Sequence, residues 1–268
     1  MGIKRTVADV ATRLQIPASL FPSKRSPCRR FHAYGVGLPR SGTHSIDGML
    51  SNYRSAHEPA AAVSTHQIML HESGCRSDAH FGRFLNLRDR FLNLEFEASH
   101  FLVYACKLLP RLFPQAKFIF TIRDPLSWIL SERNQNRSTL RSNGLWREYE
   151  LFRYDGTKPW DRQKTINNDI FTVEQYIIYW KFHCSSVLDS IPRDQLLIVP
   201  TRKIDTMLGE ITDFVEIPVS SIQRSNAHRS NKQKSYSQEK DCVDERVVKD
   251  SCQAFIESRL SEFADDLL

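Results

Sequence analysis

Residues 31–44, FHAYGVGLPRSGTH, combine glycines, hydroxyls and an arginine in the pattern of an anion-binding loop. Gly37 and Gly42 bracket four residues, Arg40 lies between them, and Thr43 follows the second glycine. Glycine lets the backbone turn its N–H groups inward, and the positive end of a helix that starts behind the loop faces the same point. The segment therefore predicts a strand, a tight turn and a helix that together bind a phosphate-like anion.

This loop differs from the Walker loop of nucleotide hydrolases, in which Lys and then Ser or Thr follow the second glycine. Here Thr43 and His44 occupy those two positions, and the cation lies inside the loop as Arg40. A P-loop kinase or NTPase remains an alternative, which Mg²⁺-dependent ATP hydrolysis would support. An ordinary strand–turn–helix junction would also explain the loop on its own, so the interpretation depends on a second motif.

A second phosphate-binding pattern follows the apolar run at residues 117–122, which is typical of a central parallel strand. Arg123 ends that run, and Asp124 with the proline after it is a typical helix start. Ser131 lies eight residues after Arg123 (131 − 123), and Ser127 lies one helical turn before Ser131. Arginine offers a fixed fork of donors to phosphate, and a serine hydroxyl on the helix would complete the contact.

Together the two motifs resemble those of sulfotransferases that use 3′-phosphoadenosine 5′-phosphosulfate (PAPS). G-x-P-R-S-G-T resembles the family's 5′-phosphosulfate loop, and R-x-P with a serine eight residues after the arginine resembles its 3′-phosphate motif. His44 departs from the second threonine that is common in the family. The resemblance implies PAPS as donor, its product PAP, no metal, and the following donor-binding residues: Pro39, Arg40, Ser41, Gly42, Thr43, His44, Arg123 and Ser131.

The resemblance also implies a catalytic base, for which the sequence leaves two candidates. Glu58 lies 18 residues after Arg40 (58 − 40), near the place of the carboxylate base in one branch of the family. His100 lies 23 residues before Arg123 (123 − 100), near the place of the catalytic histidine in the small-molecule branch. The lysine usual before that histidine is absent. Arg40 is expected to neutralise charge on the leaving phosphate.

Two later segments are expected to lie over this site. Residues 137–168 are rich in aromatic residues and turn signals, which predicts an irregular excursion that acts as a lid or acceptor wall. In the family, a basic loop near residues 220–239 closes over the nucleotide, and here Arg229 and Lys232 have the matching residue types. The R-K-G signature of the cytosolic family is missing, so a solvated basic loop is the alternative.

Apolar runs alternate with amphipathic stretches along the chain, which predicts an α/β fold. The resemblance implies a three-layer sandwich with a mostly parallel central sheet, like that of P-loop-containing sulfotransferases. We expect a lead-in at residues 1–30 and a single domain at 31–268. Beyond the strand at the loop, strands are predicted within 54–59, 93–102, 117–122 and 195–200, and helices at 45–53, 60–71, 79–91, 170–190, 204–215 and 241–268.

Composition favours anionic ligands, since the 268 residues carry a formal net charge of +6. The chain has no run of five basic residues and no zinc-finger spacing, so nucleic acid is not the expected partner. Its six cysteines form no C-x-x-C pair, which favours a reducing cytoplasm. No apolar stretch approaches the ~18–20 residues of a membrane span, and the first residues contain no signal-peptide core.

The expected function is base-assisted, in-line transfer of a sulfuryl group to a hydroxyl or amine. The absence of a signal or anchor pattern favours a small-molecule acceptor, such as a secondary metabolite, over secreted protein or glycan. A protein that binds PAP without activity remains an alternative, because His44 and the segment before His100 depart from the family pattern. The sequence leaves the acceptor and the oligomeric state open.

Overall fold

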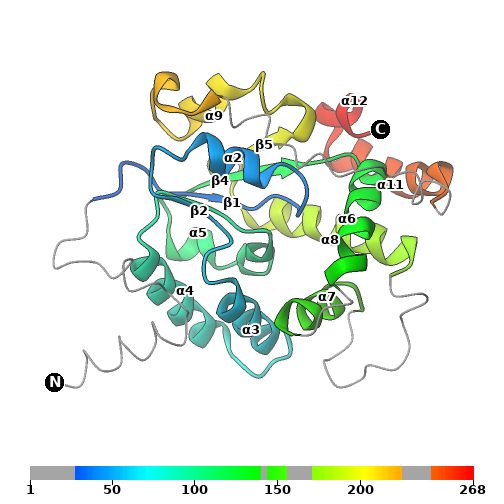
Figure 1. The fold of residues 1–268 in the computed structure, drawn as a ribbon, viewed down its shortest axis with the longest axis horizontal. Helices are drawn as coiled ribbons and strands as arrows, with labels where there is room; N and C mark the ends of the chain where they lie inside the picture. Colours follow the sequence, from blue (N-terminus) through cyan, green and yellow to red (C-terminus); the bar gives the residue numbers. More distant parts are fainter. Residues whose placement is uncertain (1–27, 140–143, 156–170, 225–242) are drawn as a thin grey trace.

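The computed structural model describes residues 28–139, 144–155, 171–224 and 243–268 (Figure 1). Its centre is a five-stranded sheet with the strand order β2-β3-β1-β4-β5, and every strand pair in it is parallel. Helices separate the successive strands along the chain, as the crossover connections of a parallel sheet require. They are β1 (Ala33–Gly35), β2 (Ser55–His57), β3 (Phe96–Ala98), β4 (Lys117–Ile122) and β5 (Leu196–Pro200).

Side chains of alternate strand residues point to opposite faces of the sheet and pack in two separate hydrophobic cores, one on each face. Ile119 and Val199 pack on one face with the helices α2 (Thr43–Met49) and α9 (Leu208–Phe214). Phe118 and Phe120 pack on the other face, in the larger core. Figure 1 shows α2 and α9 on one side of the sheet and α3, α4 and α7 on the other. The larger core is built from α3 (Ala61–Glu72), α4 (Asp78–Leu92), α5 (Leu109–Leu112), α6 (Pro125–Thr139), α7 (Leu145–Asp155), α8 (Val173–Ser190), α11 (Glu245–Arg259) and α12 (Ala264–Leu267).

The three-layer α/β architecture with a parallel sheet is therefore confirmed, and most predicted elements form with shorter bounds. Two segments differ from expectation. The segment at 137–168 is not irregular throughout, because Leu145–Asp155 forms α7 between turn signals at either end. The helix expected over 241–268 ends at Arg259, since Leu260 leaves helical geometry (φ −138°) and the chain continues through a short turn into α12. None of the helices in the described ranges combines the length and the apolar character that a membrane-spanning segment needs.

Gly37 allows the loop after β1 to lie directly against β4. A Cβ atom built at this position would lie 1.9 Å from Thr121 Oγ1 and 2.8 Å from the Thr121 carbonyl oxygen. These are distances that no relaxed side chain adopts. The backbone N–H of Leu38 donates to that same carbonyl at 3.3 Å. The pairing of β1 with β4 therefore continues into the loop and brings Gly37 close to Thr121.

We expect Gly37→Ala to destabilise the protein by about 1–3 kcal/mol, because the added methyl group forces β1 and β4 apart. Gly209→Ala is the matched control. Gly209 lies in α9, and a methyl group added there would meet no atom within 4 Å, so alanine should leave stability unchanged or raise it by up to ~1 kcal/mol. Urea-unfolding midpoints measure both changes. Equal midpoints for the two variants would contradict the packing argument.

Candidate active site

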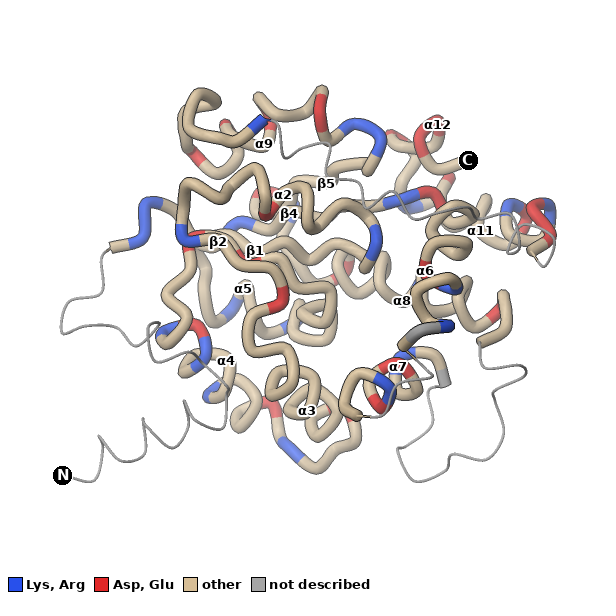
Figure 2. The backbone as a smooth tube through the Cα atoms, viewed as in Figure 1, with Lys and Arg blue, Asp and Glu red and all other residues tan. Residues whose placement is uncertain are grey.

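The loop between β1 and α2 adopts the strained geometry of an anion-binding turn. Arg40 has φ 62° and Gly42 has φ 99°, both in the left-handed region. Glycine adopts that region at no cost, whereas Arg40 is held there by its surroundings. The backbone N–H groups of Gly42, Thr43 and His44 have no hydrogen-bond acceptor within the described part of the chain. Three donors are therefore left for an anion, and Figure 2 shows basic charge in the same loop.

The two predicted phosphate motifs lie in direct contact. Arg123 donates from Nη1 to the Arg40 carbonyl oxygen at 3.3 Å, and Arg40 donates from Nε to Ser131 Oγ at 3.3 Å. Arg123 Nε also donates to Ser127 Oγ at 3.0 Å. Neither guanidinium lies within 4.0 Å of a carboxylate in the residues that the structure describes. Two uncompensated positive charges beside one loop form a site for an anionic ligand.

Ser41 has a role different from the expected one. Its hydroxyl is fully buried and bonds to the Leu38 carbonyl at 2.5 Å and the Thr121 carbonyl at 2.9 Å. The hydroxyl thus fastens the loop to β4 instead of pointing at a ligand. Two further residues that the sequence did not identify hold the loop from other sides: Trp128 donates to the Pro39 carbonyl at 2.8 Å, and Thr201 donates to the Ser41 carbonyl at 2.7 Å.

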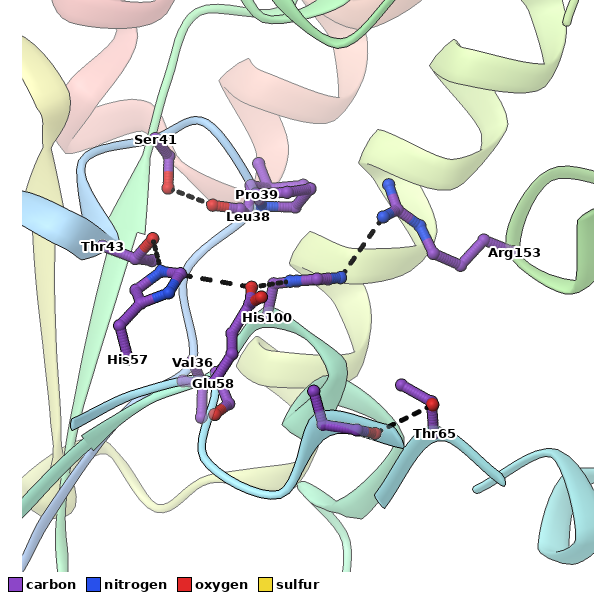
Figure 3. Close-up of polar contacts among 12 residues, drawn as sticks. Val36, Leu38, Pro39, Ser41, Thr43, His57, Glu58, Thr65, His100 and Arg153 are labelled. Atoms are coloured by element: carbon purple, nitrogen blue, oxygen red, sulfur yellow. Dashed lines mark hydrogen bonds and ion pairs between the residues drawn. The ribbon is translucent and has the colours of Figure 1, made fainter. Parts of the chain in front are cut away.

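The two candidate bases form a hydrogen-bonded pair. Glu58 follows β2 and His100 follows β3, and these neighbouring parallel strands end at the same edge of the sheet. His100 Nδ1 lies 2.6 Å from Glu58 Oε1. Glu58 and Ala60 both have positive φ, at 50° and 53°, which is uncommon for residues other than glycine. Figure 3 shows the Glu58 carboxylate facing His100.

His57 connects this pair to the anion-binding loop (Figure 3). His57 Nε2 lies 3.1 Å from Thr43 Oγ1 and 4.0 Å from Glu58 Oε1, and its ring stacks on His44 with the ring centres 3.5 Å apart. Burial lowers the pKa of His57 to about 4 against the opposing charge of Glu58. His57 is therefore neutral at pH 7 and presents one N–H and one lone pair to its neighbours.

The Glu58 carboxyl is ionised throughout the neutral range. Burial alone would raise its pKa, but the adjacent His100 imidazole and its hydrogen bond, with smaller contributions from His57 and His44, lower the pKa to about 2. Its Oε2 atom has no hydrogen-bond partner among the described residues, and 22% of the side chain is exposed. Oε2 is thus a charged acceptor that a substrate can reach.

A buried ionic cluster lies behind His100, and no sequence motif points to it. Arg153 on α7 lies 3.3 Å from His100 Nε2 and pairs with Glu132 at 2.7 Å and Glu150 at 3.1 Å. Burial raises the pKa of Glu150 to about 8, opposed by Arg153 and assisted by the nearby Glu132. Trp146, one turn of α7 before Glu150, stacks near the His100 ring at 6.2 Å. Within the segment predicted to form an acceptor wall, α7 is therefore a helix that contacts one of the candidate bases.

The remaining site predictions have no structural test. Arg229 and Lys232 lie outside the described residues. Within the described ranges, no group of three or more His, Cys, Asp or Glu side chains is placed to hold a metal ion.

Comparisons with known proteins agree with this architecture. The structure is similar to a sulfotransferase from Alicyclobacillus acidocaldarius, with 15% identity over 90% of this chain and 98% of the other and a TM-score of 0.50. It is also similar to the sulfotransferase STF9 from Mycobacterium avium, with 12% identity over 93% and 81% of the two chains and a TM-score of 0.51. A sulfotransferase domain from the curacin biosynthetic pathway matches with 12% identity over 88% and 99% and a TM-score of 0.50.

At 12–15% sequence identity, the similarity to these three structures shows only that the fold is shared. No curated protein sequence matches the chain. The family model described as "Sulfotransferase domain", however, matches residues 34–222, which include the anion-binding loop, the Glu58–His100 pair and the second phosphate motif. The chain belongs to the sulfotransferase family.

Proposed function

We propose that the protein transfers a sulfuryl group from PAPS to a hydroxyl or amine of a small-molecule acceptor. One observation carries the proposal. Thr43 in the anion-binding loop lies within hydrogen-bond distance of His57. His57 Nε2 lies 4.0 Å from the Glu58 carboxylate, which bonds to His100. A donor site and a charged proton acceptor therefore share one edge of the sheet, as a base-assisted transfer requires.

The described residues fit the donor's two anionic ends. Arg40 and the unpaired N–H groups of the loop are assigned to the 5′-phosphosulfate, and Arg123 with Ser131 to the 3′-phosphate. PAPS, when bound, supplies the sulfuryl group. Arg40 has no acidic partner among the described residues, so its charge is available to stabilise the phosphate from which the sulfuryl group departs. This assignment needs no metal ion.

Glu58 is assigned the role of base. Its carboxylate is ionised at neutral pH, and Oε2 can accept a proton from the acceptor's hydroxyl or amine. Trp146 is 40% exposed beside His100 and provides an apolar surface for the acceptor. The five cysteines that the structure describes are free thiols, which supports a reducing cytoplasm as the place of action. Formation of sulfated protein or polysaccharide would contradict a small-molecule acceptor.

A thermal-shift titration with PAP, ATP–Mg²⁺ and ADP tests the donor assignment. A ligand that binds only the native state stabilises it by about 2.7 kcal/mol at a hundredfold excess over Kd. For a chain of this length, that corresponds to a rise in Tm of roughly 5–10 °C. We expect this rise with PAP and a smaller one with ADP, which lacks the 3′-phosphate.

The same titration separates the alternatives. A rise with ATP–Mg²⁺ and none with PAP would assign the loop to a divergent kinase or NTPase. A rise with PAP without transfer of labelled sulfate from PAPS to a broad panel of phenols, alcohols and amines would indicate a PAP-binding protein without activity.

A further inference from the structure

His100 is held between a donor and an acceptor, one on each ring nitrogen. Nδ1 lies 2.6 Å from Glu58 Oε1, and Nε2 lies 3.3 Å from Arg153 Nη1. The His100 and Arg153 side chains are 6% and 1% exposed, so water has little access to either contact. The partners of a buried imidazole decide which of its nitrogens carries the proton.

Here the partners leave only one consistent arrangement. A guanidinium has N–H donors and no acceptor, so Nε2 must offer its lone pair to Arg153. Nδ1 then carries the proton and donates it to the Glu58 carboxylate, which is an acceptor only. In the other tautomer, an N–H would face the guanidinium and a lone pair would face the carboxylate. An imidazolium would also direct an N–H at the guanidinium.

We propose that Arg153 is a positioning residue that fixes His100 as the Nδ1–H tautomer, so that His100 orients Glu58 and is not itself the base. The Nε2 lone pair, which a catalytic histidine would use to accept a proton, is occupied by Arg153. The second half of this inference rests on the proposed function: the acceptor's proton moves to Glu58 Oε2, and its bonding electron pair stays on the acceptor atom that takes up the sulfuryl group.

Arg153 is itself held firmly enough to perform this role. Glu132 and Tyr154 bond to its Nη2 at 2.7 and 2.6 Å, and Glu150 bonds to Nη1 at 3.1 Å. Its guanidinium also lies over the ring of Tyr179 at 4.6 Å. Burial alone would lower the pKa of Arg153, but Glu150, Tyr154, Tyr179 and Glu132 together raise it well above its ordinary value. Arg153 is therefore a protonated donor at neutral pH.

The groups that face the His100 ring come from several elements. Glu58, just after β2, bonds to the ring, and His57, the last residue of β2, lies beside Glu58. Arg153, Tyr149 and Trp146 face the ring from α7. Behind Arg153 lie Glu150 on α7 and Glu132 on α6. Of the described groups in contact with the ring nitrogens, Arg153 alone is a permanent donor, so its removal is the sharpest perturbation of the tautomer.

Long-range ¹H–¹⁵N correlation spectra of the full chain, labelled in histidine, read the tautomer directly. The His100 resonances are assigned by their loss in His100→Asn. We expect wild-type His100 to show a protonated Nδ1 and an unprotonated Nε2 at pH 7. A protonated Nε2, alone or together with Nδ1, would overturn the proposal. This measurement needs neither PAPS nor activity, so its result is independent of whether the proposed reaction is correct.

The role of Arg153 is tested in a charge-balanced background. Arg153→Met alone would leave Glu132 unpaired in the core, so the comparison is between Glu132→Gln and the double variant Glu132→Gln/Arg153→Met. We expect the double variant to lose the uniform Nδ1–H signal and to show kcat lower by at least about tenfold, with the Kd for PAP unchanged within twofold. Arg153→Lys, which keeps a charged donor, should retain more of both the signal and kcat.

Retention of the Nδ1–H signal and of kcat in the double variant would overturn the role of Arg153. A matched loss of kcat and PAP affinity, with the tautomer unchanged, would show a purely structural role. If the double variant does not fold, the wild-type spectrum still identifies the tautomer of His100. The Arg153→Lys variant then shows whether that tautomer depends on the donor at position 153.

Discussion

Glu58→Gln is expected to lower kcat by about 10²–10⁴-fold, the usual contribution of a general base. Glutamine keeps the size of the side chain and can still accept a hydrogen bond from His100, but it cannot take up a proton from the acceptor. The Kd for PAP should stay within about twofold, because Glu58 makes no contact with Arg40, Arg123 or Ser131 in the structure. Steady-state kinetics with labelled PAPS and calorimetric titration with PAP measure the two quantities.

The chain contains a second histidine–glutamate contact that serves as a matched control. His71 Nδ1 lies 3.1 Å from Glu72 Oε1 on the surface of α3, away from the anion-binding loop. Glu72→Gln should therefore leave kcat and PAP affinity unchanged.

His100→Asn is the variant of the other member of the pair. It keeps the contact within the pair, because asparagine can still donate a hydrogen bond to Glu58. If Glu58→Gln kept its activity while His100→Asn lost it, the roles of the two residues would have to be exchanged.

The pairing of Glu58 with His100 shows where sequence reasoning reaches its limit. Each residue is identified separately, from its distance to an arginine in a phosphate motif, so the sequence presents the two as alternatives. Their meeting depends on β2 and β3 being neighbours in the sheet, and β1 lies on the far side of β3 from β2. Strand order is a property of the packed sheet, because it depends on which faces the crossover helices bury.

The two phosphate motifs are easier to place together. Both follow apolar runs that are typical of central parallel strands, and β1 and β4 are adjacent in the sheet. Arginine and serine at the carboxyl ends of neighbouring strands are therefore expected to converge. The direction of the Ser41 hydroxyl does not follow from the sequence, because a serine in such a loop has the same sequence signature whether its side chain faces a ligand or Thr121.

Arg153 has no sequence signal at all. It lies in a segment whose flanking turn residues suggest irregular structure, and no motif spacing connects it to His100, 53 positions earlier in the chain. A buried arginine is recognised only when its partners are known, since most arginines in a sequence are exposed. The prediction that Arg229 and Lys232 close over the nucleotide stays a prediction, as both lie outside the described residues.

Arg123→Ala is expected to weaken PAP binding by about 10²-fold, or ~3 kcal/mol. A guanidinium makes charge-assisted hydrogen bonds to phosphate, each worth about 1.5–3 kcal/mol. Arg123 is free to make them, because its contacts in the structure are to the Ser127 hydroxyl and the Arg40 carbonyl, with no carboxylate among the described residues that would neutralise it. The kcat at saturating PAPS should fall much less, because Arg123 is assigned to the end of the donor that does not react. Calorimetric Kd values for PAP and ADP measure the loss.

Comparison of PAP with ADP makes this prediction specific for the 3′-phosphate. If Arg123 binds that group, Arg123→Ala should weaken PAP strongly and ADP by less than about threefold, so that the preference for PAP disappears. Arg193→Ala is the matched control, because Arg193 is a surface residue paired with Glu262. An equal loss of affinity for PAP and ADP would mean that Arg123 acts on the loop through the Arg40 carbonyl, and the 3′-phosphate site would then have to be sought elsewhere in the chain.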